Sequence, residues 1–424
     1  MNGFRLPCEI GVATAATQIE GGDAPTIWHR WAAEGGARDG SSPAVACDHW
    51  NRVESDTELM ASLGIRHYRM GIEWARIQPE PHRVDQSAID HYREELALLR
   101  EAGITPLVTL HHFNDPVWFS DMGGFTNPRA TAVFARHVSR MVGALGDLAS
   151  EWITINEPNV FALFGHFLGT WPPGRKGLRS YLAALNGMAA GHIAAYEVLH
   201  RRQPHARVGV ANHLRVIEPA DPRNPLQAGL ARSASWLFQD AVTVAMATGR
   251  FQLPLRTPPR VRPGRYADFM GVNYYGRTRV AGPRAELIDA GAPINDLGWE
   301  IYPEGLGRVL EWVTSWYDGP IYITENGTAD ASDAFRSRFI HDHLKVIANH
   351  PAPVERYYHW AFTDNWEWAE GQTGRFGLVD LDYSTQVRTL RPSARFVADI
   401  ISKGAVTDGA HARWVAPQPY RVKA

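Results

Sequence analysis

Two glutamates of this chain follow short apolar segments and precede turn-forming residues. Glu157 ends the segment WITINE before Pro158, and Glu325 ends the segment IYITE before Asn326 and Gly327. The β-branched and aromatic residues of these segments predict buried strands, so each carboxylate is expected at the end of a strand. One such acid could simply cap a following helix. Two acids at matching positions, each beside an asparagine, instead favour a reaction site.

A pair of carboxyl groups that face each other suits the hydrolysis of a glycosidic bond. One carboxylic acid protonates the departing oxygen, while the other carboxylate meets the cationic sugar from the opposite face. A separation of about 5 to 5.5 Å between them gives retention, and about 6.5 to 9.5 Å gives inversion. A general acid must stay protonated and a nucleophile must stay ionised. The residue types alone do not settle the separation or the two roles.

The elements that must position these carboxylates alternate along the chain. Apolar runs bounded by turn formers predict eight strands, near residues 10, 66, 105, 152, 207, 268, 320 and 355. Helical periodicity lies between them, as in 54–64, 88–103, 132–146 and 183–202. Since a helix supplies the crossover that a parallel neighbour needs, the pattern predicts a parallel sheet closed into a (β/α)8 TIM barrel. Glu157 would then close strand four and Glu325 strand seven, at the same carboxyl-terminal end of the barrel.

The length of 424 residues suits one barrel with loop insertions, so a single catalytic domain spanning 1–424 is expected. An open doubly wound sheet is the alternative, but no GxGxxG turn follows the first strand and no Walker lysine loop occurs. The proline- and arginine-rich segment 254–265 is expected as a rigid loop before strand six. Segments 276–318 and 327–335 are expected as loops that follow strands and build the active-site face.

Composition narrows the classes of partner. A net charge of -2 and a charged fraction of 21% argue against a nucleic-acid or membrane-surface protein, because either would show a basic excess or a basic face. The N-terminal residues lack the pattern of a secretory signal, and no apolar run approaches about eighteen residues. We therefore expect a cytoplasmic protein without a nucleic-acid or membrane partner. The oligomeric state stays open.

Metal-binding and redox patterns are not found in the sequence. Cys8 and Cys47 show no paired spacing, and the 18 histidines include no HExxH or similar pattern. The adjacent His111 and His112 should point to opposite faces of a strand. We expect no metal and no cofactor. The 15 tryptophans exceed what a core of this size needs, and sugar rings stack on flat tryptophan faces, although core packing is expected for most of them.

A series of motifs resembles glycoside hydrolase family 1, the β-glucosidase family, across nearly the whole length. The matching segments are ATAATQIEGG, CDHWNRVESD, YRMGIEWARIQP, GITPLVTLHHF, WITINEP, GVNYYG, GWEIYPEGL, IYITENG, YYHWAFTDNWEWAEG, RFGLVDLDY and RTLRPSA. The resemblance implies a (β/α)8 barrel and cleavage of small-molecule β-glycosides with retention. Transferred motif by motif, Glu157 resembles the acid/base and Glu325 the nucleophile.

The same resemblance implies roles for residues around the two acids. Asn156 resembles the donor to the sugar 2-hydroxyl, and Arg69 and Tyr275 resemble the groups that hold Glu325 in place and ionised. Each has an ordinary structural alternative; Arg69, for example, could form an ion pair inside the barrel.

Five further residues resemble the sugar-binding set. Gln18 and His111 resemble hydroxyl binders, Glu367 and Trp368 the pair at the 4- and 6-hydroxyls, and Trp360 the floor beneath the ring. Taken singly, they could equally be a turn residue, a buried histidine and core tryptophans. An acid at position 367 favours unphosphorylated sugar, because a carboxylate would repel a phosphate dianion.

The leaving-group side is less defined. Trp299 of GWEIYPEGL is a candidate wall for the aglycone, and a short segment after Glu325 predicts an open entrance that admits bulky natural-product glycosides. Glucose, galactose and fucose remain alternatives for the sugar. A transglycosidase and a non-catalytic carbohydrate-binding protein remain alternative functions.

Overall fold

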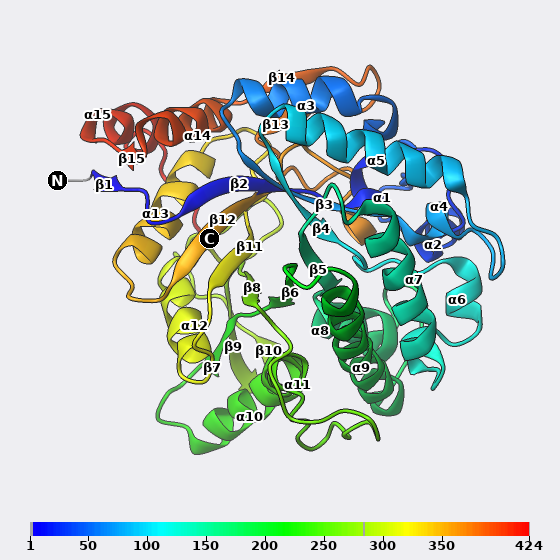
Figure 1. Cartoon of the computed structure of the whole chain (residues 1–424). Coiled ribbons are helices and arrows are strands. Elements are labelled where there is room, and N and C mark those ends of the chain that lie inside the picture. Colours follow the sequence, from blue (N-terminus) through cyan, green and yellow to red (C-terminus); the bar gives the residue numbers. More distant parts are fainter. Residues whose placement is uncertain (1–2, 283–284, 424) are drawn as a thin grey trace.

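The computed structural model describes residues 3–282 and 285–423, and its centre is a closed parallel barrel (Figure 1). The strands follow each other around the barrel in chain order, and the last pairs with the first. They are β2 (Glu9–Ala13), β3 (His67–Gly71), β4 (Thr105–Thr109), β5 (Glu151–Asn156), β6 (Arg207–His213), β8 (Phe269–Asn273), β11 (Ile321–Asn326) and β12 (Val354–Trp360). All eight predicted strands are present, and the predicted (β/α)8 TIM barrel is confirmed.

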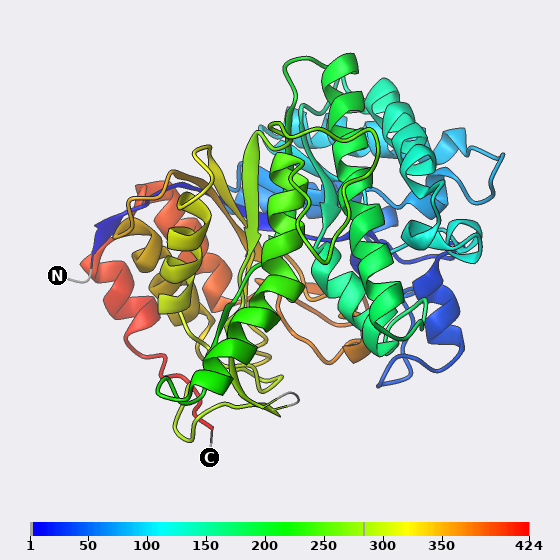
Figure 2. The ribbon, with the colours of Figure 1, turned by 90° about the horizontal axis from the view of Figure 1, so that it is seen from below.

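Helices surround the barrel, with those of the first half of the chain on one side and α12 to α15 on the other (Figure 2). They are α1 (Ala16–Ile19), α2 (Ile27–Ala33), α3 (Val53–Ser62), α4 (Trp74–Ile77), α5 (Gln86–Glu101), α6 (Val117–Asp121), α7 (Ala130–Leu145), α8 (Pro158–Ala162), α9 (Leu178–Arg202), α10 (Pro225–Ser235), α11 (Ala241–Thr248), α12 (Glu304–Thr314), α13 (Arg336–Ala348), α14 (Pro392–Lys403) and α15 (Asp408–Ala410). Short 3-10 and π turns are η1 (His49–Asn51), η2 (Gly124–Thr126), η3 (Leu163–Leu168), η4 (Trp236–Asp240), η5 (Trp368–Glu370) and η6 (His411–Val415). The four helical patterns of the sequence correspond to α3, α5, α7 and α9.

Helix α5 shows how the sequence specifies one of these helices. The Asp85 carboxylate accepts hydrogen bonds from the backbone N–H groups of Ser87 and Ala88, which satisfies donors of the first turn. Tyr92 and Leu96 recur on one face and are fully buried against the barrel. Helices of this kind place the apolar core between themselves and the strands and leave the carboxyl-terminal end of the barrel to polar side chains.

Shorter strands lie outside the barrel. β1 (Phe4–Arg5) pairs with β15 (Ala405–Val406), β13 (Val379–Leu381) with β14 (Arg388–Leu390), and β9 (Arg277–Gly282) lies between β7 (Val216–Pro219) and β10 (Ala285–Glu286). Segments 254–265 and 327–335 contain no helix or strand, as expected. The expectation of a loop over 276–318 is wrong, because this segment contains β9, β10 and the amphipathic helix α12; residues 283 and 284 lie outside the described part. In the described residues no helix is long and apolar enough to cross a bilayer.

Candidate active site

Glu157 and Glu325 meet at the carboxyl-terminal end of the barrel through a chain of hydrogen bonds. Arg69 of β3 donates from Nη1 to Glu325 Oε1 at 2.5 Å and from Nη2 to Asn156 Oδ1 at 2.6 Å. Asn273, the last residue of β8, donates from Nδ2 to Asn156 Oδ1 at 3.0 Å and to Glu157 Oε1 at 2.7 Å. Five residues from four segments of the barrel, β3, β5 with the residue after it, β8 and β11, therefore form one network with a carboxyl group at either end.

The backbone turns sharply at Glu157. This residue has φ 40° and ψ 59°, in the left-handed region, between the end of β5 and Pro158, which begins α8. A non-glycine residue in this region is uncommon and costs about 1–3 kcal/mol. Its N–H donates to the Ala211 carbonyl of the adjacent strand at 2.6 Å. The surrounding strands hold Glu157 in a conformation that an isolated chain would rarely adopt.

Glu325 is buried among groups that act on its charge in opposite directions. Burial raises its pKa, the Arg69 guanidinium lowers it, and the neighbouring Glu157 raises it. The Tyr275 hydroxyl, which donates to Glu325 Oε2 at 2.7 Å, and the Arg69 hydrogen bond lower it further, and the balance places the pKa at about 7. The predicted partnership of Arg69 and Tyr275 with Glu325 is present in the structure. The two donors engage one carboxyl oxygen each.

The residues expected to bind sugar gather beside β2 and β12. Gln18 of α1 donates from Nε2 to Asn365 Oδ1 at 2.9 Å and to Glu367 Oε2 at 3.1 Å. Its Oε1 is buried and has no hydrogen-bond partner in the described part of the chain. Burial and the nearby Glu325 raise the pKa of Glu367 to about 8, against the opposing hydrogen bonds from Gln18 and Trp360. Gln18 therefore presents an unpaired acceptor beside a carboxyl group that is largely protonated at neutral pH.

The two histidines after β4, His111 and His112, point in opposite directions. The sequence-based prediction named His111 as the sugar binder, but its ring points away from the barrel interior. The His111 ring packs edge-on against Phe125 and Phe161, and its Nε2 lies 2.9 Å from Asp115 Oδ1. These neighbours belong to η2, α8 and the segment before α6, outside the barrel. The expected alternation is correct, but the sequence does not say which ring faces inward.

His112, in place of the predicted His111, lies beside the residues expected to bind sugar. Its ring lies parallel to Trp360 and to Trp368, with centroids 5.8 Å apart in both pairs. Asn156 Nδ2 lies 3.0 Å from His112 Nε2, so the amide donates and Nε2 accepts. Burial and the Arg69 charge hold the pKa of His112 well below its usual range. Its Nδ1 then carries the proton, and among the described residues it has no partner.

Trp299 lies at the edge of this group. Its ring is 5.9 Å from that of Tyr275 at an interplanar angle of 80°, and 5.9 Å from Phe376. With 41% of its surface exposed, Trp299 is far more open than Trp360 or Trp368. The structure thus connects the aglycone candidate to the predicted nucleophile through Tyr275.

The sequence-based set omitted several members of the site. Asn273 bonds Glu157, Asn365 bonds Gln18, and His213 Nδ1 lies 3.5 Å from Glu157 Oε1 with its ring parallel to that of Tyr275. Asn273 and His213 end barrel strands, as Asn156 does, so a polar residue at a strand end was the available signal. Nothing local marked Asn365.

Cysteines and metal-type clusters lie apart from this arrangement. Cys8 and Cys47 are free thiols, and burial raises the pKa of both. Among the described residues, no three histidine, cysteine, aspartate or glutamate side chains are grouped as metal ligands.

Comparison with known proteins agrees with this geometry over nearly the whole chain. The sequence profile of glycosyl hydrolase family 1 matches residues 4–257 and 264–405. Beta-glucosidase A of Thermotoga maritima is 31% identical over 434 residues, covering 94% of this chain and 97% of the relative. A beta-glycosidase from Pyrococcus horikoshii has a TM-score of 0.89 and 33% identity over 98% of both chains. A beta-glucosidase from Thermotoga maritima in complex with glucoimidazole has a TM-score of 0.86 and 30% identity, covering 95% of this chain and 100% of the other. With its barrel, its paired carboxyl groups and a family match of this extent, the chain belongs to glycosyl hydrolase family 1 and is a glycoside hydrolase.

Proposed function

We propose that this protein is a retaining β-glycosidase of the β-glucosidase type, acting on terminal unphosphorylated β-D-glycosides through a covalent glycosyl-enzyme. The observation that carries the proposal is the unequal surroundings of two linked carboxyl groups. Glu325 accepts hydrogen bonds from a guanidinium and a phenol, whereas the side-chain hydrogen bond to Glu157 in the described part of the chain comes from the neutral amide of Asn273.

These surroundings support different roles for the two acids. Donors stabilise a negative charge, and a cationic donor does so most strongly. The Arg69 guanidinium and the Tyr275 hydroxyl therefore favour negative charge on Glu325, which suits a nucleophile. Glu157, whose side-chain donor is a neutral amide, is left to act as the general acid.

The proposed reaction has two steps. The Glu325 carboxylate attacks the anomeric carbon, the bond to the leaving oxygen breaks, and Glu157 gives its proton to that oxygen. In the second step Glu157 takes a proton from water, the resulting hydroxide oxygen attacks the anomeric carbon, and the ester bond to Glu325 breaks. Each step inverts the anomeric centre, so the product retains the β configuration.

Unpaired polar groups support a sugar subsite beside the two acids. Gln18 Oε1 can accept from a sugar hydroxyl and His112 Nδ1 can donate to one, because neither has a protein partner among the described residues. Asn156 Nδ2 keeps a second hydrogen that its bond to His112 leaves free for the 2-hydroxyl. Trp360 and Trp368, whose ring centroids each lie 5.8 Å from that of His112, provide flat apolar faces.

Glu367 supports an unphosphorylated sugar. Its carboxyl group can both donate and accept while protonated, which suits a pair of sugar hydroxyls. Once ionised it would repel a phosphate dianion. The likeness to a β-glucosidase that forms a complex with glucoimidazole supports glucose as the first sugar to test.

For the leaving group, we propose a bulky aglycone that stacks on Trp299. This ring is 41% exposed and stands next to Tyr275, and the segment from 327 to 335 is a short loop. A panel of β-glucosides tests this point. Trp299→Ala should lower kcat/KM for large aryl glucosides more than for methyl β-glucoside, and an equal loss on both would remove Trp299 from the leaving-group side.

The decisive experiment compares Glu325→Ala and Glu157→Ala on substrates with good and poor leaving groups. Glu325→Ala should lose turnover on both, and added azide should restore the release of dinitrophenol with formation of the α-glycosyl azide. Glu157→Ala should lose most activity on methyl β-glucoside but little formation of the glycosyl-enzyme from dinitrophenyl β-glucoside, because dinitrophenolate departs without protonation.

Two outcomes would contradict the proposal. Equal losses of Glu157→Ala on both leaving groups would overturn the assignment of the acid. Binding of β-glucosides without turnover by the unmodified protein would instead favour a non-catalytic carbohydrate-binding protein. Product analysis with an added alcohol acceptor separates hydrolysis from glycosyl transfer.

A further inference from the structure

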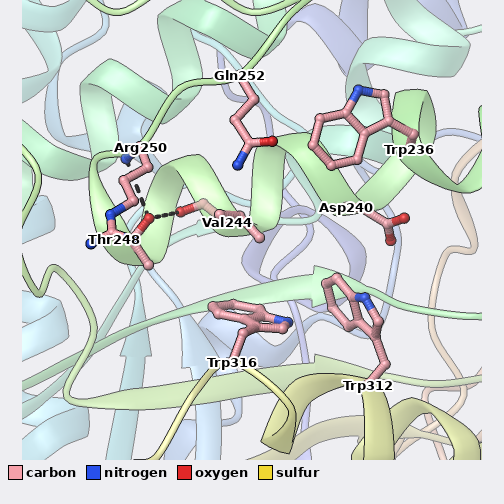
Figure 3. A pocket seen from close by; sticks show the side chains of 8 residues that line it. All are labelled: Trp236, Asp240, Val244, Thr248, Arg250, Gln252, Trp312 and Trp316. Carbon is pink, nitrogen blue, oxygen red and sulfur yellow. Dashed lines mark hydrogen bonds between the residues drawn. The ribbon is translucent and has the colours of Figure 1, made fainter.

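A second group of tryptophans lines a pocket on the outside of the barrel (Figure 3). Trp236 of η4 lies on one side of it, and Trp312 and Trp316, from α12 and just after it, lie on the other. The pocket has a volume of about 330 Å³, within the range of about 300–1,000 Å³ that ligand sites occupy. None of the residues described above at the candidate active site lines it.

The helices place this pocket away from the catalytic end. Helices that follow barrel strands run antiparallel to them, so the ends of α11 and α12 lie near the amino ends of the strands. Thr248, Arg250 and Trp316, at or just beyond those helix ends, all line the pocket. A ligand held there would not occupy the site of the two glutamates.

The three indole rings are arranged as walls. Trp236 Nε1 donates to the Leu253 carbonyl at 2.8 Å, which fixes the edge of that ring. The Trp312 and Trp316 rings are 5.3 Å apart and inclined at 67°, so they form a corner opposite the helix (Figure 3). Trp316 Nε1 is shielded from solvent and has no acceptor in the described part of the chain, so this residue offers the pocket its ring and not its N–H.

Polar groups of several kinds complete the lining. The Asp240 carboxylate accepts from Ser235 Oγ at 3.1 Å, and burial raises its pKa. No hydrogen bond or ion pair joins the Gln252 amide or the Arg250 guanidinium to another described side chain or carbonyl. The pocket thus offers an acceptor, a group that both donates and accepts, and a cationic donor around aromatic walls.

This combination discriminates between ligand classes. A cationic ligand would suit the tryptophans and Asp240, but Arg250 would repel it. A purely apolar ligand would leave the Asp240, Gln252 and Arg250 groups without partners. A pyranose ring has apolar faces for indole rings and hydroxyl groups that both donate and accept, so it matches both halves of the lining.

We propose that the pocket between α11 and α12 is a second, non-catalytic binding site for a pyranose unit of a saccharide or glycoside. Trp236 and Trp316 supply stacking faces, and Asp240, Gln252 and Arg250 bind the hydroxyl groups. The site holds substrate or product sugar at the protein surface without cleaving it.

The test separates this pocket from the active site by blocking the active site first. Dinitrophenyl 2-deoxy-2-fluoro-β-glucoside should leave a stable glycosyl group on Glu325, which a mass increase on the peptide that contains Glu325 verifies. Methyl β-glucoside is then titrated at millimolar concentrations into the labelled protein by saturation-transfer NMR and tryptophan fluorescence. Saturable binding that remains after labelling supports the second site.

Variants locate that binding. Trp316→Ala and Gln252→Ala should each weaken glucoside binding about tenfold or more. Because Gln252 is exposed, its substitution should not unfold the protein, so weaker binding by Gln252→Ala would reflect the loss of the side chain itself. Trp414 is a half-buried tryptophan on η6, and Trp414→Ala is the matched control that should leave binding unchanged.

Labelled protein that does not bind the glucoside, or binding that both variants retain, would overturn the proposal. Binding of p-nitrophenol without binding of methyl β-glucoside would also overturn it, in favour of an apolar ligand. A failure of labelling would instead count against the proposed nucleophile.

Discussion

Glu157 and Glu325 are identical side chains placed among different donors. Tyr275 and Arg69 hold Glu325, and Asn273 holds Glu157. Both acids are almost fully buried, so water contributes little to separating their behaviour. At this scale, function depends on which neighbour donates to which oxygen.

His111 and His112 are identical side chains with different neighbours, so substitutions at both test whether the neighbours determine the function of a residue. His112→Ala should lower kcat/KM for nitrophenyl β-glucoside by at least about tenfold, because it removes a donor beside Asn156 and a ring that packs against Trp360 and Trp368. Because His112 is buried as well, Tm should also fall, and the kinetics are therefore compared for the folded enzyme.

His111→Ala is the control for that prediction. It opens a space beside Phe125 and leaves Asp115 without its partner, so Tm should fall while the KM of the remaining folded enzyme changes little. Steady-state kinetics and thermal unfolding of both variants provide the measurements. A larger kinetic effect at His111 than at His112 would reverse the assignment.

Among the elements, the segment after β12 depends on a buried ion pair. Asp364 accepts from Arg391 at 2.9 and 2.8 Å and from Arg375 at 3.1 Å, and also from the Gly377 N–H at 2.8 Å. Burial raises its pKa, but the Arg391 hydrogen bonds together with the charges of Arg391, Arg336 and Arg375 outweigh burial, and the pKa is lowered. This contact joins the segment that carries Glu367 to the start of α14.

Asp364→Asn should lower the free energy of unfolding by about 3–5 kcal/mol, because it leaves Arg391 buried with a neutral partner. KM for β-glucosides should rise as the Glu367 segment loosens. Asp380→Asn is the matched control, since Asp380 also contacts Arg391 at 2.6 Å but is 50% exposed. Its effect should stay below about 1 kcal/mol. Denaturant unfolding of both variants measures the difference. Equal effects would show that the burial of the carboxylate bound to Arg391 does not determine its contribution to stability.

For the whole molecule, the polar end of the barrel has a consequence for stability. Burial raises the pKa of Glu325 to about 7 and that of Glu367 to about 8, from an ordinary value of 4.5. The folded protein therefore holds protons that the unfolded chain releases. The stability linked to these protons is fully present below about pH 4.5 and is lost as the pH rises through the folded values.

Glu367→Gln should consequently raise Tm relative to the unmodified protein, and by more at pH 8 than at pH 5. A stabilisation of at least about 1 kcal/mol at pH 8 is expected, since one pKa unit corresponds to about 1.4 kcal/mol. Thermal unfolding at the two pH values measures it.

Glu311→Gln, on the exposed face of α12, is the control and should show no such pH-dependent gain. A gain that is equal at both pH values would contradict the argument. Activity should fall in the Glu367 variant, as expected where a site is destabilised for function.

The sequence by itself determined the barrel, because apolar runs, helical periodicity and turn residues are local signals that recur eight times. It also identified Glu157 and Glu325, because an acid at the end of a buried strand is visible in the pattern. It misjudged the segment 276–318, where the many turn-forming residues obscured the short amphipathic repeat of α12.

Only the tertiary structure decided which of His111 and His112 faces the barrel, since alternation fixes their opposition but not its direction. It alone brought Asn273 to Glu157 and Asn365 to Gln18, contacts between residues 116 and 347 positions apart. It also set the balance of burial and donors around Glu325. These properties arise from neighbours that are distant along the chain, and a protonation state depends on the neighbours that folding assembles.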